Sequence, residues 1–267
     1  MVDIRGTVAP GFEPVRDAFE ANFTDHGELG AGFSLYVGGE QVVELTGGSR
    51  EPGGAPYDAD TLQLVFSSTK GVTAACAHLL VQRGMLDLDA PVSAYWPEFA
   101  AAGKADVPVR WLLTHEAGMI DVDRPMTVDE ALDWDVVTAA LAASAPVWAP
   151  GTGYGYHAVT FGWLVGEVVR RVAGIDLGEF VQLEIAGPLG LDLWVGLPDE
   201  EQSRVAPLVA AATEDLSALN EGAPNEGAPP QMSLIEALNA LLGEGNLLGR
   251  TLAAPGGALE DDELWNE

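Results

Sequence analysis

The chain is poor in basic residues. Against 41 Asp and Glu it has only 12 Lys and Arg, which gives a formal net charge of −29 over 267 residues. Binding to nucleic-acid phosphates or to an anionic membrane surface draws on Lys and Arg, so neither is expected as a partner. The charge instead predicts a soluble, self-repelling surface.

Cysteine and long apolar runs are also scarce. The single cysteine, Cys76, excludes an intramolecular disulfide and lies within an apolar helical pattern, so we interpret it as a core residue rather than a nucleophile. No run approaches the roughly 18 apolar residues of a membrane span. The first residues, MVDIRGTVAPGFEPV, lack the apolar core of a signal peptide. We therefore expect a cytoplasmic location.

Hydrophobic periodicity predicts one hairpin followed mostly by helices. A helix is expected over 14–27, and two β-rich runs over 33–46 flank Gly38-Gly39, a hairpin signal. Further helices are expected from Ser67 to Gly84 and over 127–144, 158–173 and 176–187; Thr127 and Glu130 form a capping box for the second of these.

The sequence pattern that indicates helices and strands weakens after about residue 198. A tandem pentapeptide over 220–229 is typical of a linker, a helix is expected over 233–242, and the tail is acidic. We expect one domain over 1–267, with an N-terminal helix and hairpin (1–66), a helical part (67–200) and a weakly structured remainder (201–267).

The stretch LVFSSTKGVTAACAHLL, residues 64–80, places Lys70 three residues after Ser67 on a predicted helix. Residues at i and i+3 share a helix face, so the ammonium can orient and acidify the serine hydroxyl or accept its proton. The helix N-terminus adds a positive dipole end near a developing oxyanion. The alternative is that Ser67 only caps the helix and Lys70 is solvated.

Two further stretches carry candidate site residues. In PGTGYGYHAVTFGWLVGE, residues 150–167, Tyr156 lies where a loop meets a helix and can act as a general base if a lysine lowers its pKa. The alternative for Tyr154 and Tyr156 is an ordinary core or cleft aromatic. In VRWLLTHEAGM, residues 109–119, a zincin-type site would need histidine where Met119 stands, so we interpret His115 as a buried structural residue.

These three stretches, in this order over roughly residues 12–200, resemble the serine β-lactamase and penicillin-binding-protein superfamily on its class C side. The resemblance is closest to the family VIII carboxylesterases. It implies an α+β fold of the β-lactamase type, with an antiparallel sheet flanked by helices and a helical subdomain. It also implies Ser67 as acyl-accepting nucleophile, Lys70 as its proton-transfer partner and Tyr156 as base and acid, with no metal or organic cofactor.

The sequence departs from the family pattern in two places. Where class C enzymes carry asparagine two residues after the tyrosine, the chain reads Tyr156-His157-Ala158, and His157 is expected at most to line the substrate cleft. The third motif, Lys-Thr-Gly or His-x-Gly on a core strand, has no counterpart. By resemblance, the chain corresponds to about the first two thirds of an enzyme, whether as a truncated product, a fragment or a natural short form.

The leading hypothesis is a serine hydrolase that cleaves small carboxylic esters through an acyl-enzyme on Ser67. No Gly-x-Ser-x-Gly occurs, which excludes an α/β-hydrolase. The alternatives are a β-lactamase or D-Ala peptidase, and a catalytically impaired binding protein on the same fold. Missing strands would leave an open sheet edge, so we expect self-association through that edge. They would also remove one oxyanion-hole N–H, so we expect low or absent turnover.

Overall fold

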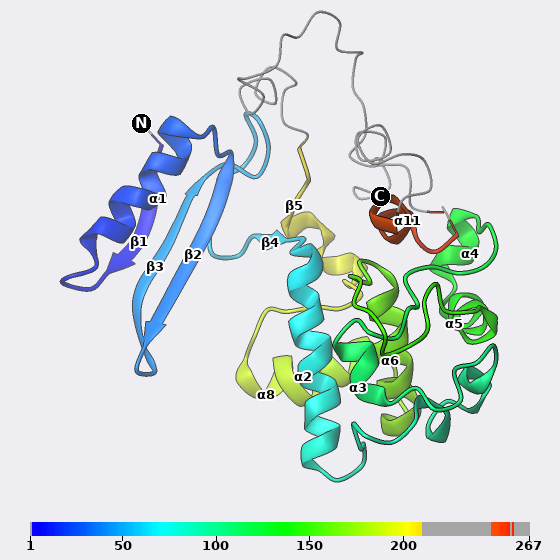
Figure 1. Ribbon diagram of the computed structural model, residues 1–267. Coiled ribbons are helices and arrows are strands. Elements are labelled where there is room, and N and C mark those ends of the chain that lie inside the picture. The colour runs from blue at the N-terminus through cyan, green and yellow to red at the C-terminus, as the bar shows by residue number, and fades with distance from the viewer. Residues whose placement is uncertain (1, 210–246, 257, 259–267) are drawn as a thin grey trace, which may run out of the picture. The chain divides into compact units, whose positions relative to one another are not determined.

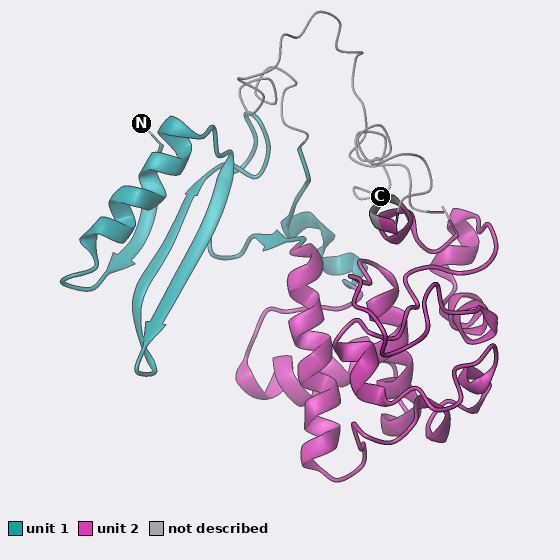
Figure 2. Cartoon of the chain, in the orientation of Figure 1, with its two compact units in different colours: residues 1–64, 197–221, 266 teal, residues 65–196, 222–265, 267 magenta. Residues whose placement is uncertain are grey.

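The computed structural model describes residues 2–209, 247–256 and 258, and the chain divides into two compact units (Figure 2). One unit is built on residues 1–64 and 197–221, the other on residues 65–196 and 222–265. The chain therefore leaves the first unit just before Ser67 and returns to it after Gly196. The linker-like repeat and the helix expected over 233–242 lie outside the described residues.

The first unit contains a three-stranded antiparallel sheet in the order β1-β3-β2 (Figure 1). The strands are β1 (Ile4–Val8), β2 (Gly30–Val37) and β3 (Glu40–Gly48). Strands β2 and β3 form the predicted hairpin. Helix α1 (Glu13–Asp25) buries Phe19 and Phe23 in one cluster with Val43 and Leu45 of β3, which confirms its predicted apolar face.

Strand β1 was not predicted, and its middle residue explains why. Gly6 interrupts the β-rich pattern, yet here it has a φ of +110° and lies against β3. A Cβ atom at Gly6 would come within 1.9 Å of the Glu44 carbonyl oxygen. Glycine is therefore required by the close approach of the two strands.

The same unit holds a short parallel pair, β4 (Leu62–Gln63) with β5 (Val205–Ala206). Arg50 ties the two segments, since its guanidinium donates to Asp58, to Thr61 and to the carbonyl oxygen of Ser203. Among the described residues, β1 and β2 each pair with β3 alone, so each presents one open edge. Self-association through such an edge stays a prediction.

The second unit is helical. Its segments are η1 (Phe66–Ser68), α2 (Thr69–Gln82), η2 (Val92–Ala94), η3 (Pro97–Ala100), α3 (Val109–Leu113), α4 (Val128–Leu132), α5 (Trp134–Ala143), α6 (Thr160–Ala173), α7 (Leu177–Val181), the π-helix η4 (Gln182–Ala186), α8 (Gly187–Leu189) and α11 (Leu247–Ala253). No helix among the residues placed here is long and apolar enough to cross a bilayer.

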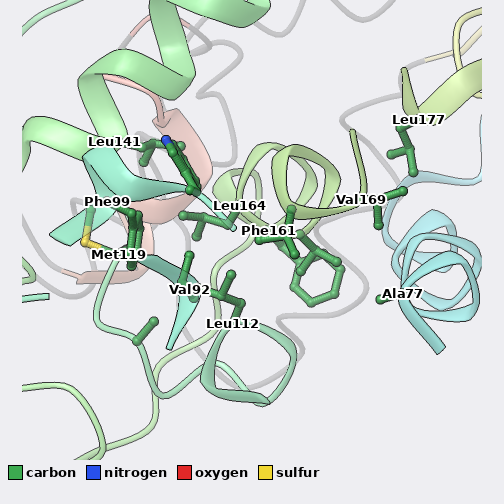
Figure 3. Packing of buried hydrophobic residues seen from close by; sticks show 14 of the residues in the cluster. Ala77, Val92, Phe99, Leu112, Met119, Leu141, Phe161, Leu164, Val169 and Leu177 are labelled. Atoms are coloured by element: carbon green, nitrogen blue, oxygen red, sulfur yellow. The ribbon is translucent and has the colours of Figure 1, made fainter. Parts of the chain in front are cut away.

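Helices α2 and α6 pack together, share the hydrophobic core of this unit and match the predicted helices (Figure 3). Helix α6 buries eight of its fourteen residues, as expected of a helix covered on most sides. Cys76 on α2 is fully buried, and burial raises the pKa of its thiol to about 11. The interpretation of Cys76 as a core residue rather than a nucleophile is thus supported.

Two helices differ from the predictions. The helix expected over 127–144 begins with the predicted Thr127–Glu130 capping box but breaks at Asp133, whose side chain caps the next helix, α5. Near the C-terminus, in a region expected to be weakly structured, Leu247–Ala253 form helix α11.

Lys104 is a buried cation held by backbone oxygens. Its side chain is fully buried, and its ammonium donates to the carbonyl oxygens of Ala101, Ala142 and Ser144. An ammonium has three N–H donors, and each is used here. Two of the acceptors lie at the end of α5, where the negative end of the helix dipole favours a cation. Burial nevertheless lowers the pKa of Lys104, although the charge of Asp123 opposes this.

We expect Lys104→Met to lower the free energy of unfolding by on the order of 3 kcal/mol, because three buried carbonyl groups lose their donor. Urea unfolding followed by circular dichroism measures this change. Arg124→Met is the matched control, since Arg124 pairs with Glu130 at the surface of the same unit and should cost less than about 1 kcal/mol. Equal losses in both variants would contradict the assigned role of Lys104.

Candidate active site

Ser67 lies in the short helix η1, which runs directly into α2. The residue before it, Phe66, has a φ of +43°, a conformation that non-glycine residues rarely adopt. Such strain is concentrated at functional sites. Ser67 is exposed, and no side chain caps the start of η1 or α2. The alternative that Ser67 merely caps the helix is therefore not supported.

Lys70 stands one turn further along and joins three parts of the site. Its Nζ donates to Ser67 Oγ at 3.0 Å and to the backbone carbonyl oxygen of Ala158. The same nitrogen lies 4.8 Å from the centre of the Tyr156 ring and 5.7 Å from that of Phe161. The lysine is thus directed at the serine rather than left in solvent.

Tyr156 comes from the loop before α6 and completes the cluster. Burial alone would raise the pKa of its phenol, but hydrogen bonds with Ser67 and Lys70 and the charge of Lys70 outweigh burial and lower it. A lowered pKa makes the phenolate more accessible and suits the group to accept a proton from Ser67. The structure therefore brings together the three residues that the sequence singled out for catalysis.

His115 lies beside this cluster, half-buried and with a φ of +64°. Its ring centre is 4.9 Å from that of Tyr156, and its Nδ1 accepts the backbone N–H of His157 at 3.1 Å. Burial, and then the charge of Lys70, lowers the pKa of His115. The neutral ring therefore carries its proton on Nε2. His115 was predicted to be a buried structural residue; it is only half-buried, and its ring lies beside the candidate catalytic residues.

The expectation that His157 lines the substrate cleft needs correction. Its side chain is fully buried, with Nδ1 paired to the Gly155 carbonyl oxygen at 2.7 Å and Nε2 accepting the N–H of Met119 at 2.9 Å. Burial lowers the pKa of His157 to about 4 and fixes the neutral form. The residue joins the loop at 115–119 to the Tyr156 loop and is structural.

Several site contacts were not predicted from the sequence. Lys70 contacts the carbonyl oxygen of Ala158 and the ring of Phe161. The hydroxyl of Thr251 bonds to the backbone on both sides of His157. Backbone acceptors carry no residue-type signal, and Thr251 is far from the motifs along the chain. Among the residues that the structure places, no three His, Cys, Asp or Glu side chains cluster as a metal site would require.

A serine bonded to a lysine on one helix, beside a tyrosine, in an α+β chain of this kind defines a protein of the serine β-lactamase and penicillin-binding-protein class. The Beta-lactamase family model matches residues 15–265. The chain belongs to this family, and its fold is β-lactamase-like.

The individual relatives include proteins named as esterases. Over 207 residues the chain is 38% identical to the esterase/beta-lactamase LipL of Mycobacterium tuberculosis, covering 76% of this chain and 48% of LipL. A family VIII carboxylesterase structure shares 46% identity with a TM-score of 0.75, covering 78% of this chain and 57% of the other. For a penicillin-binding-protein homolog from Caulobacter crescentus the identity is 38%, the TM-score 0.79 and the coverage 98% and 65%. The chain thus spans about half to two thirds of the length of these relatives.

The burial of neutral His157 predicts a pH-dependent stability. Its folded-state pKa of about 4 lies below the unfolded value of 6.5, so the unfolded state binds the proton more tightly. The stabilisation that comes from keeping His157 neutral is fully present above pH 6.5. It is lost as the pH falls toward 4, which lowers the free energy of unfolding by on the order of 3 kcal/mol. Urea unfolding of the wild type and His157→Asn at several pH values between 7 and 4 measures it. The free energy of unfolding should decline less steeply with falling pH in the variant than in the wild type. Equal slopes would refute this account.

Proposed function

We propose that this protein is a serine hydrolase that cleaves small carboxylic esters through an acyl-enzyme on Ser67. The observation that carries the proposal is the 3.0 Å hydrogen bond from Lys70 Nζ to Ser67 Oγ, with the Tyr156 ring centre 4.8 Å from the same nitrogen. The names of the esterase relatives support the substrate class. No metal or organic cofactor enters the proposed reaction.

In the proposed first step, Ser67 Oγ attacks the ester carbonyl carbon while its proton passes to the Tyr156–Lys70 pair. The same proton is then given to the departing alcohol, and the acyl group remains on Ser67 as an ester. Water attacks this ester with its proton accepted by the same pair, releasing the carboxylic acid and restoring the serine hydroxyl. The position of Ser67 at the start of the η1–α2 helix favours the negative charge that develops on the carbonyl oxygen.

A β-lactamase or D-Ala peptidase activity is the second candidate. The name of the LipL relative includes both esterase and β-lactamase. The sequence Tyr156-His157-Ala158 lacks the asparagine of class C enzymes, and the burial of His157 leaves no replacement for that amide in its place. The missing amide favours a carboxylic ester over a β-lactam or peptide as the substrate. Covalent labelling by a fluorescent penicillin at rates that exceed those of ester acylation would reverse the preference.

The reactivity of Ser67 can be tested with a fluorophosphonate probe and intact-mass detection. We expect a single adduct on the wild type and none on Ser67→Ala, with labelling of Lys70→Ala slowed at least about 100-fold. Ser68→Ala is the matched control, because this neighbouring serine is also exposed and should leave labelling unchanged. A well-folded wild type without an adduct would favour the alternative of an impaired binding protein on this fold.

The lowered pKa of Tyr156 makes a separate prediction for pH dependence. If the phenolate accepts the Ser67 proton, kcat/KM for p-nitrophenyl butyrate should rise with pH along a limb that lies below the usual tyrosine pKa of about 10. Tyr156→Phe should lose that limb and lower kcat by on the order of 100-fold. Tyr154→Phe is the control, since Tyr154 is 71% exposed. A limb that persists in Tyr156→Phe would assign the base to another group.

A further inference from the structure

Helix α11 brings one residue from near the C-terminus to the Tyr156 loop. Thr251 is only 2% exposed, and both hydrogen-bonding functions of its hydroxyl are used. Its Oγ1 donates to the carbonyl oxygen of Tyr156 at 2.9 Å and accepts the N–H of Ala158 at 2.8 Å. One side chain therefore bridges the backbone on both sides of His157.

The two bridged residues, Tyr156 and Ala158, are the loop residues that contact Lys70 of helix α2. The Ala158 carbonyl oxygen accepts from Lys70 Nζ, and the Tyr156 ring centre lies 4.8 Å from the same nitrogen. A shift of this backbone would move the acceptor and the phenol away from the ammonium together. Displacements of about 1 Å at such sites are sufficient to lower a rate by as much as 100-fold.

Two histidine side chains of the same unit make further hydrogen bonds to the loop that carries Tyr156. His157 receives the backbone N–H of Met119 and donates its own backbone N–H to His115. Helix α6 begins only at Thr160 and has no side-chain cap, so the Ala158 N–H lies before the helix. Thr251 supplies a hydrogen-bond partner to the backbone of each bridged residue, and both bonds are partly buried.

The segment that carries Thr251 is itself anchored. Beyond α11, the N–H of Gly256 donates to Asp121 Oδ1 at 2.8 Å and the carbonyl oxygen of Gly256 accepts the N–H of Met126 at 3.1 Å. Arg250 pairs with the same Asp121 at 3.6 Å. These contacts fix the helix against the loop at 121–126 and hold the Thr251 hydroxyl in place.

We propose that Thr251 is a positioning residue that sets the geometry of the Ser67–Lys70–Tyr156 cluster through the backbone of Tyr156 and Ala158. Its catalytic consequence rests on the hydrolase function proposed above. Thr251 does not face the reacting atoms and acts only through the residues it holds. A segment that follows the three sequence motifs by nearly a hundred residues would thus be needed for an ordered site.

The test compares Thr251→Val, which keeps the shape and removes the hydroxyl, with Thr251→Ser, which keeps the hydroxyl. With p-nitrophenyl butyrate we expect Thr251→Val to lower kcat about tenfold with KM within about twofold, and Thr251→Ser to stay within about threefold of the wild type. Thr138→Val is the matched control, because this buried threonine bonds only to carbonyl oxygens within α5. It should leave kcat unchanged.

A second measurement does not depend on turnover. Tyrosine labelled with ¹³C at Cζ gives five signals in this chain, and Tyr156→Phe assigns the one from Tyr156. Because hydrogen bonds with Ser67 and Lys70 hold the pKa of Tyr156 down, Thr251→Val should raise that pKa, and neither Thr251→Ser nor Thr138→Val should. If the wild type fails to hydrolyse the ester, the proposed function fails while this titration still decides the role of Thr251.

An unchanged Tyr156 titration in a folded Thr251→Val variant would overturn the proposal, as would equal effects of the valine and serine variants. If Thr251→Val does not fold, Asp121→Ala takes its place, since it loosens the anchor at Gly256 and leaves Thr251 intact. A raised Tyr156 pKa in Asp121→Ala would support the proposal. An unchanged value there, with a folded protein, would refute it.

Discussion

The Lys70 ammonium is the contact on which the site depends. It reaches from helix α2 to the serine one turn earlier and to the loop before α6, and so connects two elements that are far apart in the sequence. Its position near a helix N-terminus is unfavourable for a cation unless it has acceptors there. The Ser67 hydroxyl and the Ala158 carbonyl oxygen supply them.

The two lysines of this chain differ in the groups that accept their hydrogen bonds. Lys104 is fully buried and its three donors go to backbone carbonyl oxygens, so it stabilises the fold and offers nothing to a substrate. Lys70 bonds to the Ser67 hydroxyl and the Ala158 carbonyl oxygen and lies beside the Tyr156 ring, so it contacts two groups that can themselves gain or lose a proton. The difference between a structural and a reactive lysine therefore lies in its acceptors.

The sequence was a good guide to local structure and to the motifs. Periodicity predicted α1, the β2–β3 hairpin, α2 and α6, and the Ser67–Lys70 spacing predicted their proximity, because each of these depends on residues close in sequence. The break at Asp133 was missed because propensity favoured one continuous helix. The role of His157 was misassigned because its neighbours in sequence say nothing of its burial, and Thr251 was missed because its partners lie almost a hundred residues away.

The candidate catalytic residues all lie in one of the two units. Ser67, Lys70, Tyr156 and Thr251 all belong to the helical unit, so the proposed nucleophile and its proposed proton acceptors come together without residues from the sheet unit. Acylation of a reactive probe needs little more than these groups. Efficient hydrolysis also needs donors for the oxyanion of each tetrahedral intermediate, and loss of one such donor lowers the rate by on the order of 100- to 1,000-fold. Because the chain spans 48–65% of the length of these relatives, the proposed Ser67 acylation and the proposed ester turnover are separate predictions that need separate tests.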